Sequence, residues 1–186
     1  MKRVTIVYFS GYGHTRKLAQ SVLEGVNRVA DISGQMIEIS PQGTLSETDW
    51  NLLSDSHGII FGAPTYMGSC AGAFKMWQDS TSKVFARDGW KDKIAAGFTM
   101  SGTLSGDKLN SLFQLAVLAA QHGMIWVGQA QKTVGKTDAD LNRLGSYLGL
   151  MAQSDNGPAE DTVLASDKET AVLFGIRVAE TVNRFN

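Results

Sequence analysis

The sequence holds a single cysteine, Cys70, among its 186 residues. One cysteine cannot form a disulfide within the chain, and it cannot supply a zinc site that needs several thiolates. Cytosolic proteins keep their thiols reduced and rarely carry disulfides. We therefore expect no metal site and a protein suited to the cytoplasm.

The sequence also lacks long apolar runs and clusters of basic residues. No segment reaches the roughly 18 apolar residues that a membrane span needs, and the apolar run Val4–Phe9 is too short for the core of a signal peptide. The formal net charge is −1, whereas binding to duplex nucleic acid depends on many Lys and Arg contacts with phosphates. We therefore expect neither a membrane span nor nucleic acid as a partner.

What the sequence does contain is a series of short β-branched apolar runs that alternate with longer segments of helical spacing. This alternation is typical of a parallel sheet wrapped by helices. Five strands are predicted, at residues 4–9, 35–39, 58–61, 94–100 and 124–127. Two apolar stripes at helical spacing predict core-facing helices between them: Leu18, Val22, Val26 and Val29, and then Leu109, Leu112, Phe113, Ala116, Val117 and Ala120.

The last third of the chain has a different composition. Residues 128–165 are rich in Gly, Asp, Gln and Asn and contain no convincing strand, so we interpret them as a long excursion after the fifth strand. Beyond them, Ser166 and Glu169 have the spacing of a capping box. This spacing predicts a final helix from Ser166 to about Arg184.

The segment Ser10–Thr15 lies between the first predicted strand and the first predicted helix. Ligands of open α/β sheets bind beyond the carboxyl ends of the strands, and a helix N-terminus offers free N–H groups to a phosphate. A P-loop is excluded because no Gly-Lys-Ser/Thr follows, and a dinucleotide fingerprint is excluded because Arg16 replaces its third glycine. The hydroxyls of Ser10 and Thr15 favour a terminal phosphate monoester, and a plain capped turn is the alternative.

Two more loops follow the third and fourth predicted strands. Gly62–Gly68 contains a proline that fixes the backbone direction and an exposed Tyr-Met pair that can pack on a planar ring. Thr99–Gly106 is polar and rich in glycine, so it can lay successive N–H and C=O groups along the edge of a heterocycle. Each loop alone could be an ordinary turn. Three such loops along one crevice favour a ligand that combines a phosphate with a planar ring.

These stretches together resemble the flavodoxin-like quinone reductases, closest to the WrbA type of NAD(P)H:quinone oxidoreductase. The resemblance is carried by Ser10–Thr15, Gly62–Gly68, Ser101–Thr103 and His122–Met124, in the family's order. It implies one flavodoxin-like domain over residues 1–186. This fold is α/β, a doubly wound five-stranded parallel sheet of strand order 2-1-3-4-5 with helices on both faces. The chain departs from the family in a short connection between the second and third strands.

The resemblance also implies FMN as the cofactor and NADH or NADPH as the electron donor. The implied catalytic residues are Tyr12, which would receive the nicotinamide nucleotide, His122, which would lie near the flavin ring, and Phe85, which would wall the quinone pocket. The implied cofactor-binding residues are Ser10, Gly11, Tyr12, Gly13, His14, Thr15, Pro64, Thr65, Tyr66, Met67, Gly68, Thr99, Met100, Ser101, Gly102, Thr103, Leu104 and His122.

We therefore predict an FMN-dependent oxidoreductase that passes two electrons from NAD(P)H to a quinone or a similar acceptor. The resemblance implies a homodimer or a homotetramer. One alternative is a flavodoxin-type one-electron carrier, although the net charge of −1 does not match the strongly acidic surface of a dedicated carrier. A non-catalytic flavin-binding regulatory module is the other alternative.

Overall fold

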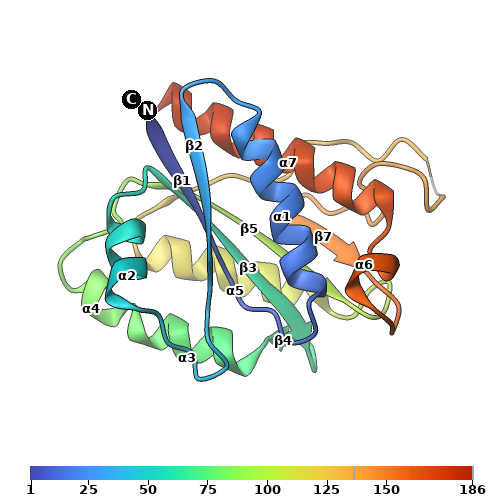
Figure 1. Cartoon of the computed structure of the whole chain (residues 1–186), viewed down its shortest axis with the longest axis horizontal. Helices are drawn as coiled ribbons and strands as arrows, with labels where there is room; N and C mark the ends of the chain where they lie inside the picture. The colour runs from blue at the N-terminus through green and yellow to red at the C-terminus, as the bar shows by residue number, and fades with distance from the viewer. Residues whose placement is uncertain (136, 186) are drawn as a thin grey trace.

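The computed structural model describes residues 1–135 and 137–185, and a largely parallel β-sheet forms its centre (Figure 1). The strands are β1 (Lys2–Tyr8), β2 (Ile32–Glu38), β3 (Gly58–Tyr66), β4 (Ser69–Cys70), β5 (Ile94–Ser101), β6 (Ile125–Trp126) and β7 (Leu150–Gln153). Their order is β2-β1-β3-β5-β6, with β4 beside β3 and β7 beside β5. The predicted order 2-1-3-4-5 is confirmed, because the fourth and fifth predicted strands are β5 and β6.

Helices cover both faces of the sheet (Figure 1). They are α1 (His14–Asn27), α2 (Glu47–Ser54), α3 (Gly72–Ser80), α4 (Ser82–Phe85), α5 (Lys108–Gln121), α6 (Ala159–Thr162) and α7 (Ala165–Arg184). The apolar sides of α1 and α7 pack into the core on one face, and those of α2, α3, α4 and α5 pack into the core on the other. The sheet is packed between these two hydrophobic cores. Because its main strands are parallel, their carboxyl ends lie at the same end of the sheet.

The edge of the sheet beside β5 is filled by two short strands instead of one. β6 pairs with Ile94 and Ala95 at the start of β5, and β7 pairs with the last four residues of β5. The prediction that residues 128–165 contain no strand is therefore wrong. β7 has no β-branched residue and only four positions, so its pattern is too short to recognise, yet Leu150 and Ala152 are buried in the core.

Helices α1 and α7 cross at a pair of glycines. A Cβ on Gly25 would overlap the carbonyl oxygen of Val172, and a Cβ on Gly175 would overlap that of Val22. Because glycine has no Cβ, the two backbones can approach each other this closely. The crossing fixes α1 against α7 and thereby fixes the loop at the N-terminus of α1.

Helix α5 buries a different face from the predicted one. Leu112, Leu115 and Leu118 are buried, whereas Leu109, Phe113 and Val117 of the predicted stripe are exposed. Apolar residues lie on two sides of this helix, so their spacing alone does not decide which side faces the sheet. The prediction of the helix is correct, and the prediction of its core face is wrong.

Helix α7 begins one residue earlier than predicted and without the predicted capping box. Ser166 lies inside the first turn, where its hydroxyl donates a hydrogen bond to the carbonyl oxygen of Asp138 instead of capping the helix. The helix is 20 residues long. Neither α7 nor any other helix of residues 1–135 and 137–185 is long and apolar enough to cross a membrane.

Candidate functional site

The N-terminus of α1 presents unpaired backbone N–H groups. The N-cap residue Gly13 has a φ of 90° and no side chain caps the helix there, while the hydroxyl of Ser10 accepts a hydrogen bond from the N–H of Arg16 at 3.2 Å. The N–H groups of residues 12–15 form no hydrogen bond within the described part of the chain. With no acidic residue in the first turn, these donors and the helix dipole suit a phosphate group.

The ring of Tyr66, at the end of β3, lies across this loop. A Cβ on Gly11 would come within 2.5 Å of the Tyr66 hydroxyl oxygen. Tyr12 meets Tyr66 edge to face, with 6.0 Å between the ring centroids. Partial burial raises the pKa of the Tyr66 hydroxyl, so it stays protonated at neutral pH. The two rings form an aromatic wall on which a planar ring can pack.

A pocket of about 300 Å³ opens between these loops at the carboxyl ends of the strands. Its lining residues lie at the carboxyl ends of β3 and β5 and in the segments after β1, β5 and β7. They are Tyr12, His14, Thr15, Pro64, Thr65, Tyr66, Met100, Ser101, Gly102, Ser154, Asp155, Asn156 and Gly157. The structure thus brings the three loops singled out in the sequence to one pocket. It adds a fourth segment, Ser154–Gly157, that the sequence did not predict.

This fourth segment and α6 lie over the N-terminus of α1. Nε2 of His14 donates a hydrogen bond to the carbonyl oxygen of Gly157 at 3.1 Å, and Lys17 forms an ion pair with Glu160. The segment was missed because β7 was missed. Its sequence, Ser-Asp-Asn-Gly, is typical of a turn, and a polar turn directly after a parallel strand would have indicated a ligand loop.

Three hydroxyl groups form a buried chain beneath the pocket. The hydroxyl oxygen of Thr65 lies 2.7 Å from that of Thr99 and 2.7 Å from that of Ser111. Thr99 is fully buried by this contact and does not line the pocket. The thiol of Cys70 donates to the carbonyl oxygen of Ser111, and burial raises its pKa to about 11, so it is protonated and unreactive at neutral pH.

Met67 and Gly68 form the turn between β3 and β4. Both have positive φ angles, 47° and 80°, and the flanking residues Tyr66 and Ser69 pair with each other. Two consecutive residues with positive φ are typical of a type I′ hairpin turn. Met67 is fully exposed at its tip, so neither Met67 nor Gly68 lines the pocket in this structure.

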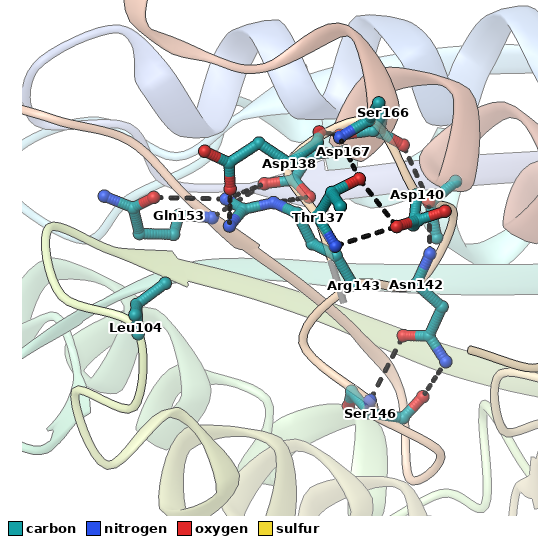
Figure 2. A network of polar contacts seen from close by, with 12 residues as sticks. Leu104, Thr137, Asp138, Asp140, Asn142, Arg143, Ser146, Gln153, Ser166 and Asp167 are labelled. Atoms are coloured by element: carbon teal, nitrogen blue, oxygen red, sulfur yellow. Dashed lines mark hydrogen bonds and ion pairs between the residues drawn. The ribbon is translucent and has the colours of Figure 1, made fainter. Parts of the chain in front are cut away.

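The loop after β5 separates the pocket from a larger hollow. Ser101 and Gly102 line the pocket, whereas Leu104 lines a hollow of about 970 Å³ between α5 and the excursion at residues 137–144. Figure 2 shows the side chain of Leu104 directed toward the polar network of that excursion. Thr103 lines neither the pocket nor the hollow.

The centre of that network is Arg143 (Figure 2). Its guanidinium donates to both carboxylate oxygens of Asp167, at 3.0 Å each, and to the side-chain oxygen of Gln153 at 3.1 Å. The amide nitrogen of Gln153 in turn donates to the carbonyl oxygen of Gly102 at 3.2 Å and to the carboxylate of Asp155 at 3.0 Å. The network therefore connects α7 with two of the loops that line the pocket.

His122 and Phe85 lie at the other edge of the sheet. His122 follows the last residue of α5 and lies three residues before the start of β6. The ring of Trp90 packs on it with 4.6 Å between centroids. Phe85, at the end of α4, meets the His122 ring edge to face at 6.1 Å. The hydroxyl oxygen of Thr81 lies 2.9 Å from Nε2 of His122. Burial lowers the pKa of His122, so the ring is neutral at pH 7.

Neither His122 nor Phe85 lines this pocket of the single chain, and their roles near the flavin and the quinone stay predictions. Helix α5 begins near the carboxyl end of β5 and contains 14 residues, which at 1.5 Å per residue carry the chain about 20 Å away. His122 must then lie at the amino-terminal edge, where the next strand begins. Of the three predicted catalytic residues, only Tyr12 lines the pocket.

Comparisons with known proteins agree with this geometry. The sequence model of a family described as NADPH-dependent FMN reductase matches residues 4–139. The chain is 40% identical to flavodoxin FldP of Pseudomonas aeruginosa over 182 residues, which cover 96% of both proteins. It is 30% identical to an NAD(P)H dehydrogenase (quinone) of Solidesulfovibrio magneticus, with 97% of this chain and 98% of the relative covered.

A solved structure extends the likeness to the whole fold. The crystal structure of a flavodoxin, WrbA-like protein from Agrobacterium tumefaciens superposes with a TM-score of 0.81 at 38% identity. The match covers all of this chain and all of that protein. The long excursion after β6 and the segment after β7 therefore fall within the shared fold.

Proposed function

Since the chain belongs to the NADPH-dependent FMN reductase family, within the flavodoxin-like proteins close to the WrbA type, we propose that it passes two electrons from NADH or NADPH to a quinone. A similar small acceptor could take the place of the quinone. The proposal depends on one observation above all. The unpaired N–H groups at the start of α1 and the aromatic wall of Tyr12 and Tyr66 meet at one pocket.

The residues at this pocket fit FMN. The N–H groups of residues 12–15 and the hydroxyl of Thr15 would hold the phosphate, since they are donors at the positive end of a helix dipole. Pro64 and Tyr66 would flank the isoalloxazine ring. Of residues 99–104, Met100, Ser101 and Gly102 line the pocket and would contact the polar rim of the ring and the ribityl chain. We add Ser154–Gly157 to the ribityl contacts because this segment closes the same pocket.

Bound FMN would accept a hydride and pass on two electrons, while the protein supplies position and access. Tyr12 is 79% exposed at the mouth of the pocket, so its ring is available to receive the nicotinamide nucleotide. Both substrates would then stack in turn over the same exposed face of the flavin ring. The oxidised nucleotide must then leave before the acceptor enters, and a ping-pong pattern follows.

We propose that Phe85 and His122 contribute to a flavin site only in a homo-oligomer. Both lie at the amino-terminal edge of the sheet, so they can reach a flavin only across a contact with a second subunit. A homodimer or a homotetramer would allow this. Sedimentation at working concentration would test it, since a strictly monomeric active protein would remove both residues from the site.

A flavodoxin-type carrier is the second candidate, because the relative at 40% identity is named a flavodoxin. A carrier passes single electrons and docks on protein partners, often through an acidic face. The net charge of −1 does not favour such docking. A non-catalytic flavin-binding module would bind FMN and turn over neither nucleotide nor quinone.

Steady-state kinetics with NADPH or NADH and benzoquinone distinguish these functions. We expect parallel lines in double-reciprocal plots, the mark of a ping-pong reductase. Intersecting lines would show both substrates bound together and would contradict stacking on the same ring face. Turnover with neither nucleotide, combined with build-up of a one-electron-reduced flavin on photoreduction, would favour the carrier.

A further inference from the structure

A buried lysine lies directly behind the loop that follows β5. Lys108 is the first residue of α5, and its side chain is only 1% exposed. Its ammonium donates hydrogen bonds to the hydroxyl of Ser101 at 2.8 Å and to the carbonyl oxygens of Thr103 and Leu104 at 2.7 and 2.9 Å. An ammonium has three protons to donate, so this loop satisfies all of them.

The same loop is held from the side of β7. The carbonyl oxygen of Gly102 accepts a hydrogen bond from the Gln153 side chain, which the Arg143 guanidinium fixes in place (Figure 2). Three successive carbonyl groups, those of residues 102–104, therefore point to side chains behind the loop. The N–H groups of these three residues make no hydrogen bond within the described part of the chain. The loop is thus held in order from behind, and Gly102 brings a free N–H donor to the wall of the pocket.

Lys108 has no carboxylate in hydrogen-bond contact. Its three acceptors are a hydroxyl and two carbonyl oxygens, whereas the buried Asp167 and the exposed Asp138 both pair with Arg143. Burial lowers the pKa of Lys108 to about 8, with Asp167 opposing the shift and Arg143 adding to it. The ammonium is still charged at neutral pH. Burying a cation without a carboxylate partner costs free energy. A negative charge that forms near Lys108 would offset part of this cost.

We propose that Lys108 is a positioning residue for the flavin: it holds the loop of residues 101–104, of which Ser101 and Gly102 line the pocket, beside the polar edge of the ring, and its charge favours the reduced ring. This inference rests on the proposed function, because it takes FMN to occupy this pocket. Uptake of two electrons and one proton leaves the flavin ring with one negative charge. A fixed cation behind the loop stabilises that charge and raises the reduction potential.

Two variants separate the hydrogen bonds from the charge. Lys108→Met removes both, whereas Lys108→Gln keeps N–H donors without the charge. Lys75→Met is the control, since Lys75 forms an exposed pair with Asp79 on α3. For each protein, the affinity for oxidised FMN is measured by fluorescence quenching. The midpoint potential of bound FMN is measured by anaerobic equilibration with reference dyes at neutral pH.

We expect the ratio of the affinities for oxidised and reduced FMN to rise about tenfold in both Lys108 variants. For a two-electron couple this corresponds to a fall of about 30 mV in the midpoint potential of bound FMN. FMN affinity should fall about tenfold in Lys108→Met and less in Lys108→Gln, and Lys75→Met should change neither quantity. Unchanged potentials in both Lys108 variants would overturn the inference, whatever the affinities. If Lys108→Met does not fold, Lys108→Gln alone decides. Failure of the unchanged protein to bind FMN would instead reject the proposed function.

Discussion

Arg143 and Asp167 form a two-pronged ion pair, with Nε–Oδ1 and Nη2–Oδ2 distances of 3.0 Å, although their side chains expose only 4% and 2% of their surface. Asp167 also accepts a hydrogen bond from the backbone N–H of Gln153 in β7. The pair therefore fixes the start of α7, the excursion and the last strand relative to one another. Through Gln153, which accepts from Arg143 and donates to Gly102 and Asp155, the pair also fixes two of the loops that line the pocket.

Asp167→Asn should destabilise the protein strongly. The substitution leaves the buried Arg143 with only the exposed carboxylate of Asp138 as a counter-charge, and breaking a buried pair such as Arg143–Asp167 costs about 3–5 kcal/mol. Urea unfolding followed by circular dichroism measures the loss. Glu24→Gln is the control, because the Glu24–Arg28 pair is about half exposed and should contribute less than about 1 kcal/mol. Equal losses in the two variants would show that burial of the Arg143 pair is irrelevant.

Gly175→Ala should destabilise the crossing of α1 and α7. Its new Cβ would overlap the carbonyl oxygen of Val22, so the helices must separate, at a cost of about 1–3 kcal/mol in unfolding free energy. Gly72→Ala is the matched control, because a Cβ there meets nothing within 4 Å and should be neutral or stabilising by up to about 1 kcal/mol. Thermal and urea unfolding should therefore show a loss of stability in Gly175→Ala and none in Gly72→Ala. A Gly175→Ala protein as stable as the unchanged protein would contradict the close crossing.

Thr15→Val should weaken binding of FMN without weakening binding of riboflavin. Thr15 lines the pocket at the start of α1, where its hydroxyl would donate to the phosphate. A hydrogen bond to a charged group contributes about 1.5–3 kcal/mol, which corresponds to a tenfold or larger change in affinity. Riboflavin lacks the phosphate and serves as the internal comparison. Thr48→Val, at an exposed position of α2, controls for the substitution itself. A loss shared equally by FMN and riboflavin would place the phosphate elsewhere.

His122→Gln should make the protein less sensitive to acid. Burial among Trp90, Phe85 and Thr81 lowers the pKa of His122 in the folded state. Below about pH 6.5 the histidine of the unfolded chain therefore binds a proton, whereas His122 in the folded chain stays neutral until a lower pH. The unfolding free energy falls as the pH decreases from about 6.5 toward the lower pKa of the folded state. Unfolding at pH 7.5 and 5.5 should show a smaller drop for the variant than for the unchanged protein. An equal drop would mean that His122 carries no proton linkage.

The sequence predicted the fold and three of the four pocket loops because these features depend on local patterns. Strands β1, β3 and β5 are long and apolar, and parallel strands carry their carboxyl ends to one edge. The glycines and hydroxyls of Ser10–Thr15 lie directly beyond such an end. Their place in the molecule follows from the order of strands and helices alone.

The parts that were missed depend on tertiary contacts. β7 has four residues, and only its pairing with β5 and the burial of Leu150 make it a strand; the loop Ser154–Gly157 was lost with it. The face of α5 was set by packing against the sheet. The place of His122 could have been predicted, because a residue between a helix and the following parallel strand lies at the amino-terminal edge.

Anaerobic stopped-flow reduction tests the central claim most directly. The FMN-loaded protein is mixed with NADPH or with NADH while the flavin absorbance is recorded, and benzoquinone is then added. We predict rapid two-electron bleaching by at least one nucleotide, followed by rapid recovery of the absorbance with the quinone. No bleaching by either nucleotide, in a protein that holds FMN, would contradict the reductase and leave a carrier or a binding module.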